Sequence, residues 1–152
     1  LADPRIGAFG TMALLFLIVG KIILLTEIIT QDGMSWQWLV VIPFLARVGM
    51  VYFFIITPEA RDKGLAAFFK KRFHNQSLLI ATLISSAIAV GFIVIVGGDV
   101  LVAITTLVAL FICARVYKLW TKKHFGGVTG DVSGAFVEGM EVVLWLLIFI
   151  LL

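Results

Sequence analysis

The sequence predicts an all-α, polytopic membrane protein with about five transmembrane helices and an interfacial amphipathic segment. Hydrophobic residues make up 62% of the 152-residue chain and charged residues 14%, whereas soluble domains average about 45–50% and about 25%. Several stretches of about 20 residues carry almost no charge, which is the length that a helix needs to cross a ~30 Å hydrocarbon core. These observations exclude a soluble enzyme and a disordered tail, and a single cysteine, Cys113, excludes a disulfide scaffold.

The first two expected spans carry internal charges. The first covers about residues 8–29 and includes Lys21 and Glu27, and the second covers about residues 36–56 and includes Pro43 and Arg47. A helix in lipid must turn such residues toward protein or water, because hydrocarbon offers no partner to a charge or to an interrupted backbone hydrogen bond. We therefore expect a polar neighbour beside the second span.

A polar segment at residues 57–77 separates the second and third spans. It begins with several charged residues and continues as the apolar run 65–69, which three basic residues follow. An apolar stretch beside Lys and Arg is typical of a helix that lies in the membrane interface. We expect its apolar side to rest on the bilayer surface.

The second half of the chain predicts a helical hairpin and a final span. The third span, at about 78–96, and the fourth, at about 100–117, are joined by a Gly-Gly-Asp turn at 97–99. Residues 118–133 are polar and rich in glycine, and a last span covers about 134–152.

Basic residues predict which side each connection faces. Of the 12 Lys and Arg residues, ten lie near the amino terminus, in 57–77, or at and just after the end of the fourth span. The turns at 30–35 and 97–99 contain none. Cytoplasmic loops carry the excess of Lys and Arg, so we expect these basic segments on the cytoplasmic side of the cell membrane, the inner or plasma membrane. This placement explains the net charge of +3 without nucleic-acid binding.

The segment 125–135 carries the strongest chemical signal. Its four glycines let backbone N–H groups approach an anion, and the helix that follows directs its positive N-terminal end to the same place. Asp131, Glu138 and Glu141 are spaced so that all three carboxylates can share one helical face. Carboxylates beside a phosphate site indicate a divalent cation, and Mg²⁺ is the natural choice because it takes one or two carboxylates and bridges to phosphate oxygens.

Each of these positions also has a purely structural interpretation. The glycines can serve close helix packing, and Asp131 is well placed to be a helix N-cap. Arg47 can reach a buried phosphate or pair with a carboxylate, and the residues alone leave these two roles open. For Lys21, snorkelling or an ion pair is favoured over contact with a substrate.

Together these residues resemble a known family. Gly-Gly-Val-Thr-Gly-Asp at 126–131, followed by Gly-Ala at 134–135 and by Glu138 and Glu141, resembles the carboxy-terminal signature of cobalamin synthase, the adenosylcobinamide-GDP ribazoletransferase of bacteria and archaea. The Gly-Gly-x-Thr-Gly-Asp element is the most specific motif of that family. One departure is Phe-Val at 136–137, where the family commonly has Ala-Asn before the first glutamate.

Further motifs agree in the same order along the chain. Asp-Pro-Arg-Ile-Gly at 3–7 is similar to the family's Asp-x-Arg-Ile-Gly at the start of a transmembrane helix. Arg47 with Met50 resembles the Arg-x-x-Met of the next span, and residues 60–65 resemble the family's Ala-Arg-x-x-Gly-Leu loop. The resemblance covers nearly all of the chain but only the later part of the family's usual length. We therefore interpret 1–152 as a single transmembrane helical domain that lacks the amino-terminal part of the intact enzyme, including an acidic Asp-Gly-Leu-Ala-Asp type motif.

The resemblance implies an enzyme that joins adenosylcobinamide-GDP to alpha-ribazole, or to its 5'-phosphate, and releases GMP. It implies Mg²⁺ as the cofactor, with Asp131 and Glu138 as catalytic and metal-binding residues and Asp3 as a further metal ligand. The active site is expected to face the cytoplasm. The substrate-binding residues that the resemblance implies are Arg5, Arg47, Arg61, Gly126, Gly127, Thr129 and Gly130.

Two alternative functions stay open. A membrane CDP-alcohol phosphotransferase also uses clustered aspartates at the cytoplasmic membrane surface, but its denser Asp-Gly-x-x-Ala-Arg pattern is missing here. A transporter or a structural membrane subunit would use the charged residues within the spans to line a path or to hold helices together. The lipid bilayer is a partner on every interpretation, and association as a homo-oligomer or with other corrinoid-pathway proteins is left open.

Overall fold

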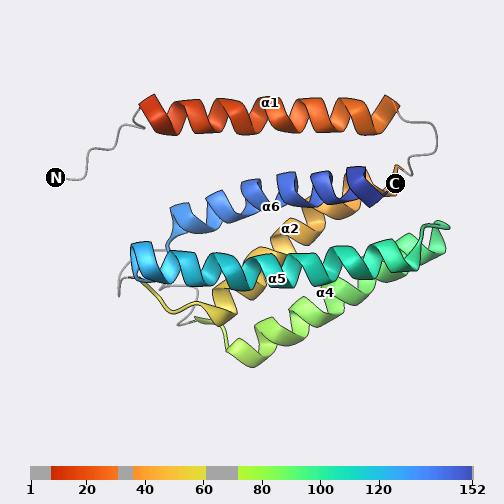
Figure 1. The fold of residues 1–152 in the computed structure, drawn as a ribbon. Helices are drawn as coiled ribbons and strands as arrows, with labels where there is room; N and C mark the ends of the chain where they lie inside the picture. Colours follow the sequence, from red (N-terminus) through yellow and green to blue (C-terminus); the bar gives the residue numbers. More distant parts are fainter. Residues whose placement is uncertain (1–7, 31–35, 61–71, 152) are drawn as a thin grey trace.

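The computed structural model describes residues 8–30, 36–60 and 72–151, and it is built from long helices (Figure 1). All of them are long and apolar enough to cross a membrane, which confirms the predicted fold class. The interfacial segment expected within 57–77 falls mostly on residues 61–71, outside the described residues. The five helices of the described ranges are α1 (Ala8–Thr30), α2 (Gln37–Ile56), α4 (Asn75–Ile95), α5 (Val100–Phe125) and α6 (Gly130–Leu151).

Two helix boundaries differ from the sequence prediction. The fourth span was expected to end near residue 117 and the last to begin near 134, whereas α5 continues to Phe125 and α6 begins at Gly130. Hydropathy marks where a chain leaves the apolar region, but a helix ends where its backbone conformation changes. That change comes at Gly126, whose φ of 77° is left-handed and is typical of a helix C-terminus. The connection between α5 and α6 is therefore short, covering 126–129.

Helix α2 lies at the centre of the bundle and packs against α4, α5 and α6. It runs obliquely behind α5 and α6 in Figure 1. Trp38, Leu45 and Phe53 on this helix are at most 1% exposed. At Gly49 an added Cβ would collide with Leu110 of α5, so the missing side chain allows these two helices to approach closely.

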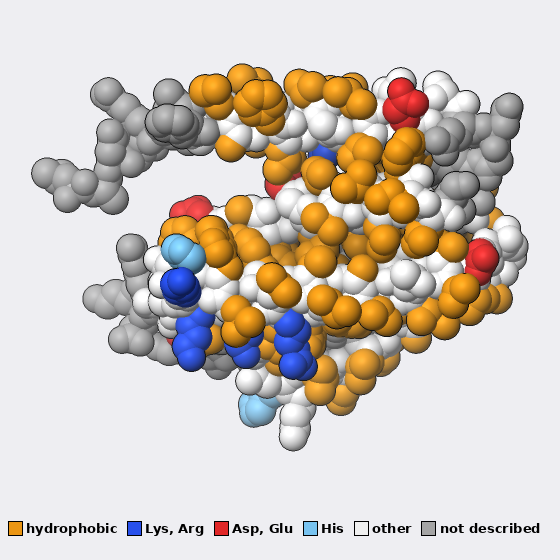
Figure 2. Space-filling view, in the orientation of Figure 1, with side chains coloured by type: hydrophobic (Ala, Val, Ile, Leu, Met, Phe, Trp, Pro, Cys, Tyr) orange, Lys and Arg blue, Asp and Glu red, His pale blue; other side chains and the backbone are white. Residues whose placement is uncertain are grey.

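The two ends of the bundle carry different connections. Residues 57–60, after α2, and residues 126–129, between α5 and α6, lie at one end, which we call the loop end (Figure 1). The turn between α4 and α5 lies at the opposite end, the hairpin end, where Gly97 has a φ of 85° and Asp99 accepts a hydrogen bond of 2.7 Å from the Leu101 N–H. In the space-filling view, Lys and Arg side chains gather toward the loop end (Figure 2).

Helix α1 stands at the side of the bundle and packs chiefly against α6. Most of its side chains are exposed, although Ile28 near its C-terminus is 2% exposed and belongs to the core. An apolar surface of this kind is suited to lipid, in which burial against other helices brings no hydrophobic gain. The position of α1 must therefore depend on specific contacts.

Candidate functional site

The two segments of the loop end are hydrogen-bonded to each other. The Val128 N–H donates to the Pro58 carbonyl at 2.8 Å, and the Ala60 N–H donates to the Val128 carbonyl at 3.3 Å. These bonds form a short parallel bridge between Glu59 and Val128. A Cβ at Gly127 would overlap the backbone of residues 58–60, so only glycine permits this approach. We call the joined segments, 57–60 and 126–129, the cradle.

Helix α6 begins directly after the cradle, and Thr129 is its N-cap. The Thr129 side-chain oxygen accepts a hydrogen bond of 3.3 Å from the Val132 N–H, and its carbonyl accepts one of 3.1 Å from the Ser133 N–H. The structural alternative that Asp131 is the cap is therefore wrong. Asp131 instead lies exposed in the first turn, where the helix dipole favours a negative charge and where N–H groups point out of the helix.

Four charged side chains meet where α1, α2 and α6 approach each other. Lys21 of α1 donates to Glu138 at 2.6 Å and to Glu141 at 2.7 Å, both on α6. Arg47 of α2 also donates to Glu141. The ion-pair interpretation of Lys21 is thus confirmed. We call these four residues the charge cluster, in which two acids balance two bases.

Arg47 has a carboxylate partner, which is one of the two alternatives that the sequence leaves open. Its Nη1 donates to Glu141 and, at 3.2 Å, to the carbonyl of Pro43 one turn earlier. The side chain is still 52% exposed and lines a groove of about 190 Å³ between α2 and α4. A guanidinium has further donors on Nε and Nη2, so contact with a phosphate stays a prediction that is compatible with this ion pair.

The carboxylates of α6 do not all share one site. Glu141 is 8% exposed and its two oxygens are bound by Lys21 and Arg47, so it faces the core rather than the loop end. Asp131 and Glu138 are about 10 Å apart along the helix by its rise. Within the described ranges, no group of three or more His, Cys, Asp or Glu side chains could hold a metal ion. Glu141 is therefore engaged in ion pairs, and the assignment of Asp131 and Glu138 to a metal stays a prediction.

Asp131 and Glu138 are the two carboxylates of α6 that the sequence assigns to a magnesium site. Asp131 is exposed in the first turn of α6, and the Glu138 side chain, about two turns farther along the helix, is 46% exposed. Mg²⁺ commonly takes one or two protein carboxylates and fills its remaining positions with water and phosphate oxygens. Among the described residues there is no cage of three or more such protein ligands, so a magnesium site at this pair stays a prediction.

The other residues predicted for the site fall into two groups. Gly126, Gly127, Thr129 and Gly130 form or adjoin the cradle, so the structure brings them together with Asp131. Asp3, Arg5 and Arg61 lie outside the described residues.

An aromatic support beneath the start of α6 was not predicted. The Tyr117 hydroxyl donates to the Val132 carbonyl at 3.1 Å, and the ring of Phe136 stacks on Phe53 at 5.2 Å between centroids. Phe136 is one of the two residues that depart from the family pattern, and at 2% exposed it is a core residue. The only sequence signal for this support is the helical spacing of aromatic residues, which is also typical of any packed core.

Comparison with known proteins gives one consistent result. The family model for cobalamin-5-phosphate synthase matches residues 1–149. An adenosylcobinamide-GDP ribazoletransferase of Geobacillus sp. (strain WCH70) is 32% identical over 156 residues, covering 99% of this chain and 57% of the relative. A protein of the same name from Chlorobium phaeobacteroides (strain BS1) is 33% identical over 144 residues, covering 94% of this chain and 56% of the relative. The chain thus spans a little over half of the length of these relatives. No solved structure gives a significant match.

Proposed function

The chain belongs to the cobalamin-5-phosphate synthase family, and on that premise we propose that the whole protein is an adenosylcobinamide-GDP ribazoletransferase. The proposed reaction is the assembly of the lower nucleotide loop of a corrinoid. A hydroxyl of alpha-ribazole, or of its 5'-phosphate, attacks the phosphorus that is bonded to the corrinoid side chain. A new P–O bond forms, the P–O bond to GMP breaks, and the hydroxyl proton leaves with the phosphate oxygens of GMP or with water.

One observation carries this proposal. The cradle joins the segment that starts the Ala-Arg-x-x-Gly-Leu motif to the Gly-Gly-x-Thr-Gly-Asp motif through two backbone hydrogen bonds. The family resemblance links both segments to phosphate binding. They lie about 70 residues apart in the sequence and meet at one end of the bundle. In a purely structural subunit we would not expect these two segments to meet beside the exposed carboxylate of Asp131.

The chain's own residues act by binding and orientation. The N–H groups of Gly130 and Asp131 lie in the first turn of α6, where such groups have no acceptor within the helix, and they can bind phosphate oxygens of the GDP group. Arg47 is proposed to contact a phosphate through the guanidinium atoms that do not bind Glu141. Phosphoryl transfer depends mainly on such positioning and on electrostatic stabilisation.

We propose that Asp131 and Glu138 hold Mg²⁺. An ion held there would supply positive charge to offset the negative charge that develops on GMP. Asp3 is proposed as a third ligand, and Arg5 and Arg61 as further phosphate contacts. Because Lys21 already donates to Glu138, that carboxylate would have one oxygen directed to Lys21 and the other available to a cation.

We further propose that the loop end faces the cytoplasm of the cell in its plasma (inner) membrane. The gathering of basic side chains at this end supports the orientation, since cytoplasmic segments carry the excess of Lys and Arg (Figure 2). The nucleotide substrate would then be reached from the side on which such compounds are made. An association with a second copy or with other proteins of corrinoid assembly belongs to the same proposal.

Release of GMP tests the activity. The purified protein in lipid vesicles is given adenosylcobinamide-GDP, alpha-ribazole and Mg²⁺, and GMP is measured over time. We expect GMP to appear only when both substrates are present. Uptake of the corrinoid into vesicles without release of GMP would instead support a transporter.

Asp131→Asn is the variant that tests the site. We expect it to fold normally, because Thr129 provides the cap of α6, and to lose turnover by about 10²-fold, because a charge beside the reacting phosphate is removed. The matched control is Asp99→Asn at the hairpin end, where Asn keeps the capping hydrogen bond to Leu101. Near-normal turnover by Asp131→Asn at saturating Mg²⁺ would remove Asp131 from the site.

A further inference from the structure

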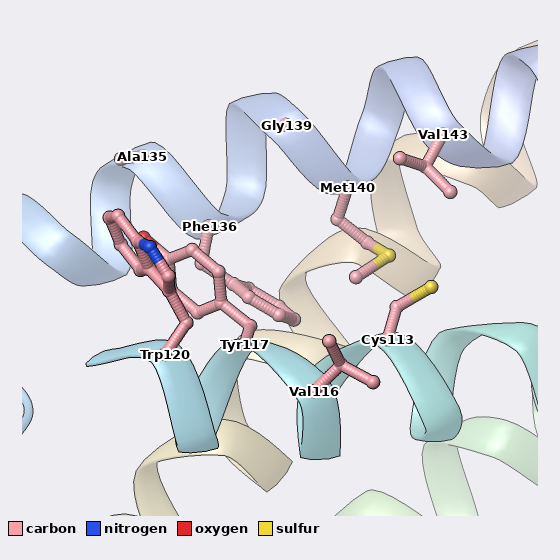
Figure 3. A pocket seen from close by; sticks show the side chains of 9 residues that line it. All are labelled: Cys113, Val116, Tyr117, Trp120, Ala135, Phe136, Gly139, Met140 and Val143. Carbon is pink, nitrogen blue, oxygen red and sulfur yellow. The ribbon is translucent and has the colours of Figure 1, made fainter. Parts of the chain in front are cut away.

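A lateral groove of about 340 Å³ lies between α5 and α6, on the opposite side of α6 from the charge cluster. Tyr117 and Trp120 of α5 face Phe136 of α6 across it, and the sulfur atoms of Cys113 and Met140 approach each other farther along (Figure 3). The groove follows α5 from Cys113 to Trp120, which is about 10 Å by the helical rise. Its volume is in the range of ligand sites in proteins.

The groove has a buried floor and an exposed rim. Phe136 and Met140 on the floor are 2% and 5% exposed, whereas Val116 and Trp120 on the rim are 61% and 46% exposed. Gly139 also lines the groove, and a Cβ added there would meet nothing within 4 Å. The opening is therefore toward the membrane, along the length of two spanning helices, and its walls are almost entirely hydrocarbon and aromatic.

Positive charge stands at one end of the groove. The groove-lining stripe of α5, with residues spaced by three and four, continues beyond Trp120 to Lys123 and His124 in the last turn of the helix. The His124 ring lies 5.1 Å from the Trp120 ring, which extends the aromatic wall to the loop end. Lys122 lies on the opposite side of α5 by the helical angle, so of the two adjacent lysines only Lys123 flanks the groove.

We propose that this groove binds an anionic phospholipid, with one acyl chain between α5 and α6 and its phosphate beside Lys123. An apolar channel that opens laterally into the bilayer matches an acyl chain, and a lysine at the level of the headgroups matches an anionic phosphate. An apolar helix from a partner would also fit the walls, but it would leave the charge of Lys123 without a complement. The site is independent of the proposed transferase reaction.

Lipid selectivity is the first test. The purified protein in detergent is titrated with phosphatidylglycerol or phosphatidylcholine of identical acyl chains, and native mass spectrometry counts bound lipid. We expect phosphatidylglycerol to bind about fivefold more tightly, the factor that one lysine near an anionic headgroup contributes. Glycerol phosphate, which lacks acyl chains, should not compete. Equal binding of the two lipids, or full competition by glycerol phosphate, would overturn the proposal.

Two pairs of variants locate the site. Gly139→Leu fills the groove and should weaken phosphatidylglycerol binding by about tenfold, because side chain and acyl chain need the same space. Gly91→Leu on α4 adds the same side chain to open space elsewhere and should bind lipid normally. Lys123→Gln should abolish the preference for phosphatidylglycerol, and Lys122→Gln should keep it.

The same variants separate a lipid from a protein partner. If native mass spectra show a dimer that Gly139→Leu dissociates, the groove binds a second copy and the lipid proposal is wrong. Unchanged lipid binding by Gly139→Leu would also refute it. Ala135→Val narrows the same groove by a smaller amount, and it replaces Gly139→Leu in the test if that variant fails to fold.

Discussion

Gly127 and Gly134 belong to the same motif, yet their surroundings are opposite. An added Cβ at Gly127 would overlap the backbone of residues 58–60, which two hydrogen bonds hold in the cradle. An added Cβ at Gly134, within α6, would meet nothing within 4 Å. A neighbouring segment therefore requires glycine at position 127. No contact among the described residues requires glycine at position 134.

Alanine substitutions should separate the two roles. We expect Gly127→Ala to lower the free energy of unfolding by about 2 kcal/mol, because the backbone must shift away from residues 58–60. Gly134→Ala should leave stability unchanged or raise it by up to about 1 kcal/mol, because alanine favours the helix. Thermal unfolding in detergent measures both, and equal effects from the two changes would show that the cradle contact is unimportant.

At the scale of single helices, the charge cluster is the specific contact that positions α1. Helix α1 offers lipid most of its apolar surface, and Lys21 joins it to α6 through both glutamates. The Lys21 side chain is 17% exposed and that of Glu141 is 11% exposed, so this part of the cluster is largely shielded from solvent. Removing one partner would leave buried charge without compensation.

Lys21→Met is therefore expected to destabilise the protein by about 3 kcal/mol, the magnitude typical of a broken buried ion pair. Lys21→Arg should retain most of the stability because it keeps the positive charge. The matched control is Ile22→Met, which places the same side chain at a neighbouring position that is 58% exposed. Unfolding in detergent at increasing temperature gives all three values. A Lys21→Met protein as stable as the control would mean that other contacts hold α1.

The sequence predicted the helices better than their ends. Long uncharged runs are sufficient to predict spanning helices, because a bilayer permits few other structures. The extension of α5 to Phe125 could not be predicted from hydropathy, because polar residues such as Lys122 continue a helix outside the apolar region as readily as apolar ones do. The sequence suggests Asp131 as a possible N-cap, but Thr129 is equally suitable by residue type, and only the folded backbone shows that Thr129 is the cap.

At the scale of the whole molecule, the alternation of loop end and hairpin end predicts which positions share a side of the membrane. Ser77, near the start of α4, and Val100, at the start of α5, lie at opposite ends of a spanning helix pair, and both are exposed. Gly98 is less suitable for labelling, because a side chain there would collide with Ile93.

Cysteines introduced as Ser77→Cys and Val100→Cys, in a Cys113→Ala background, should react with an impermeant reagent from opposite sides of sealed vesicles. The cysteine at 77 should be accessible from the cytoplasmic side, because basic residues concentrate at that end. The Cys113→Ala protein alone gives the background signal. Labelling of both positions from one side would reject the five-helix topology.

Part of the candidate site could be predicted from the sequence, but the packing of that site could not. The glycine motif and Asp131 are contiguous in sequence, so their proximity follows from the chain itself. The pairing of Val128 with Pro58 joins segments that are far apart in sequence, and no local pattern encodes it. The commitment of Glu141 to Lys21 and Arg47 is likewise a property of three packed helices, which is why a carboxylate that seemed available for metal is engaged elsewhere.

The charge cluster also sets a condition on how the chain is made. Lys21 and Glu141 are 120 residues apart, and at the usual rate of about 5–20 residues per second the ribosome needs about 6–24 s to travel between them. During that interval Lys21 and Arg47 lack Glu138 and Glu141, the carboxylates that pair with them in the folded protein. A chain interrupted before α6 would never acquire these two carboxylates. Synthesis of α6 is thus the step that gives Lys21 and Arg47 their carboxylate partners and links the helices. A chain with α6 can form these ion pairs, and a chain without α6 cannot.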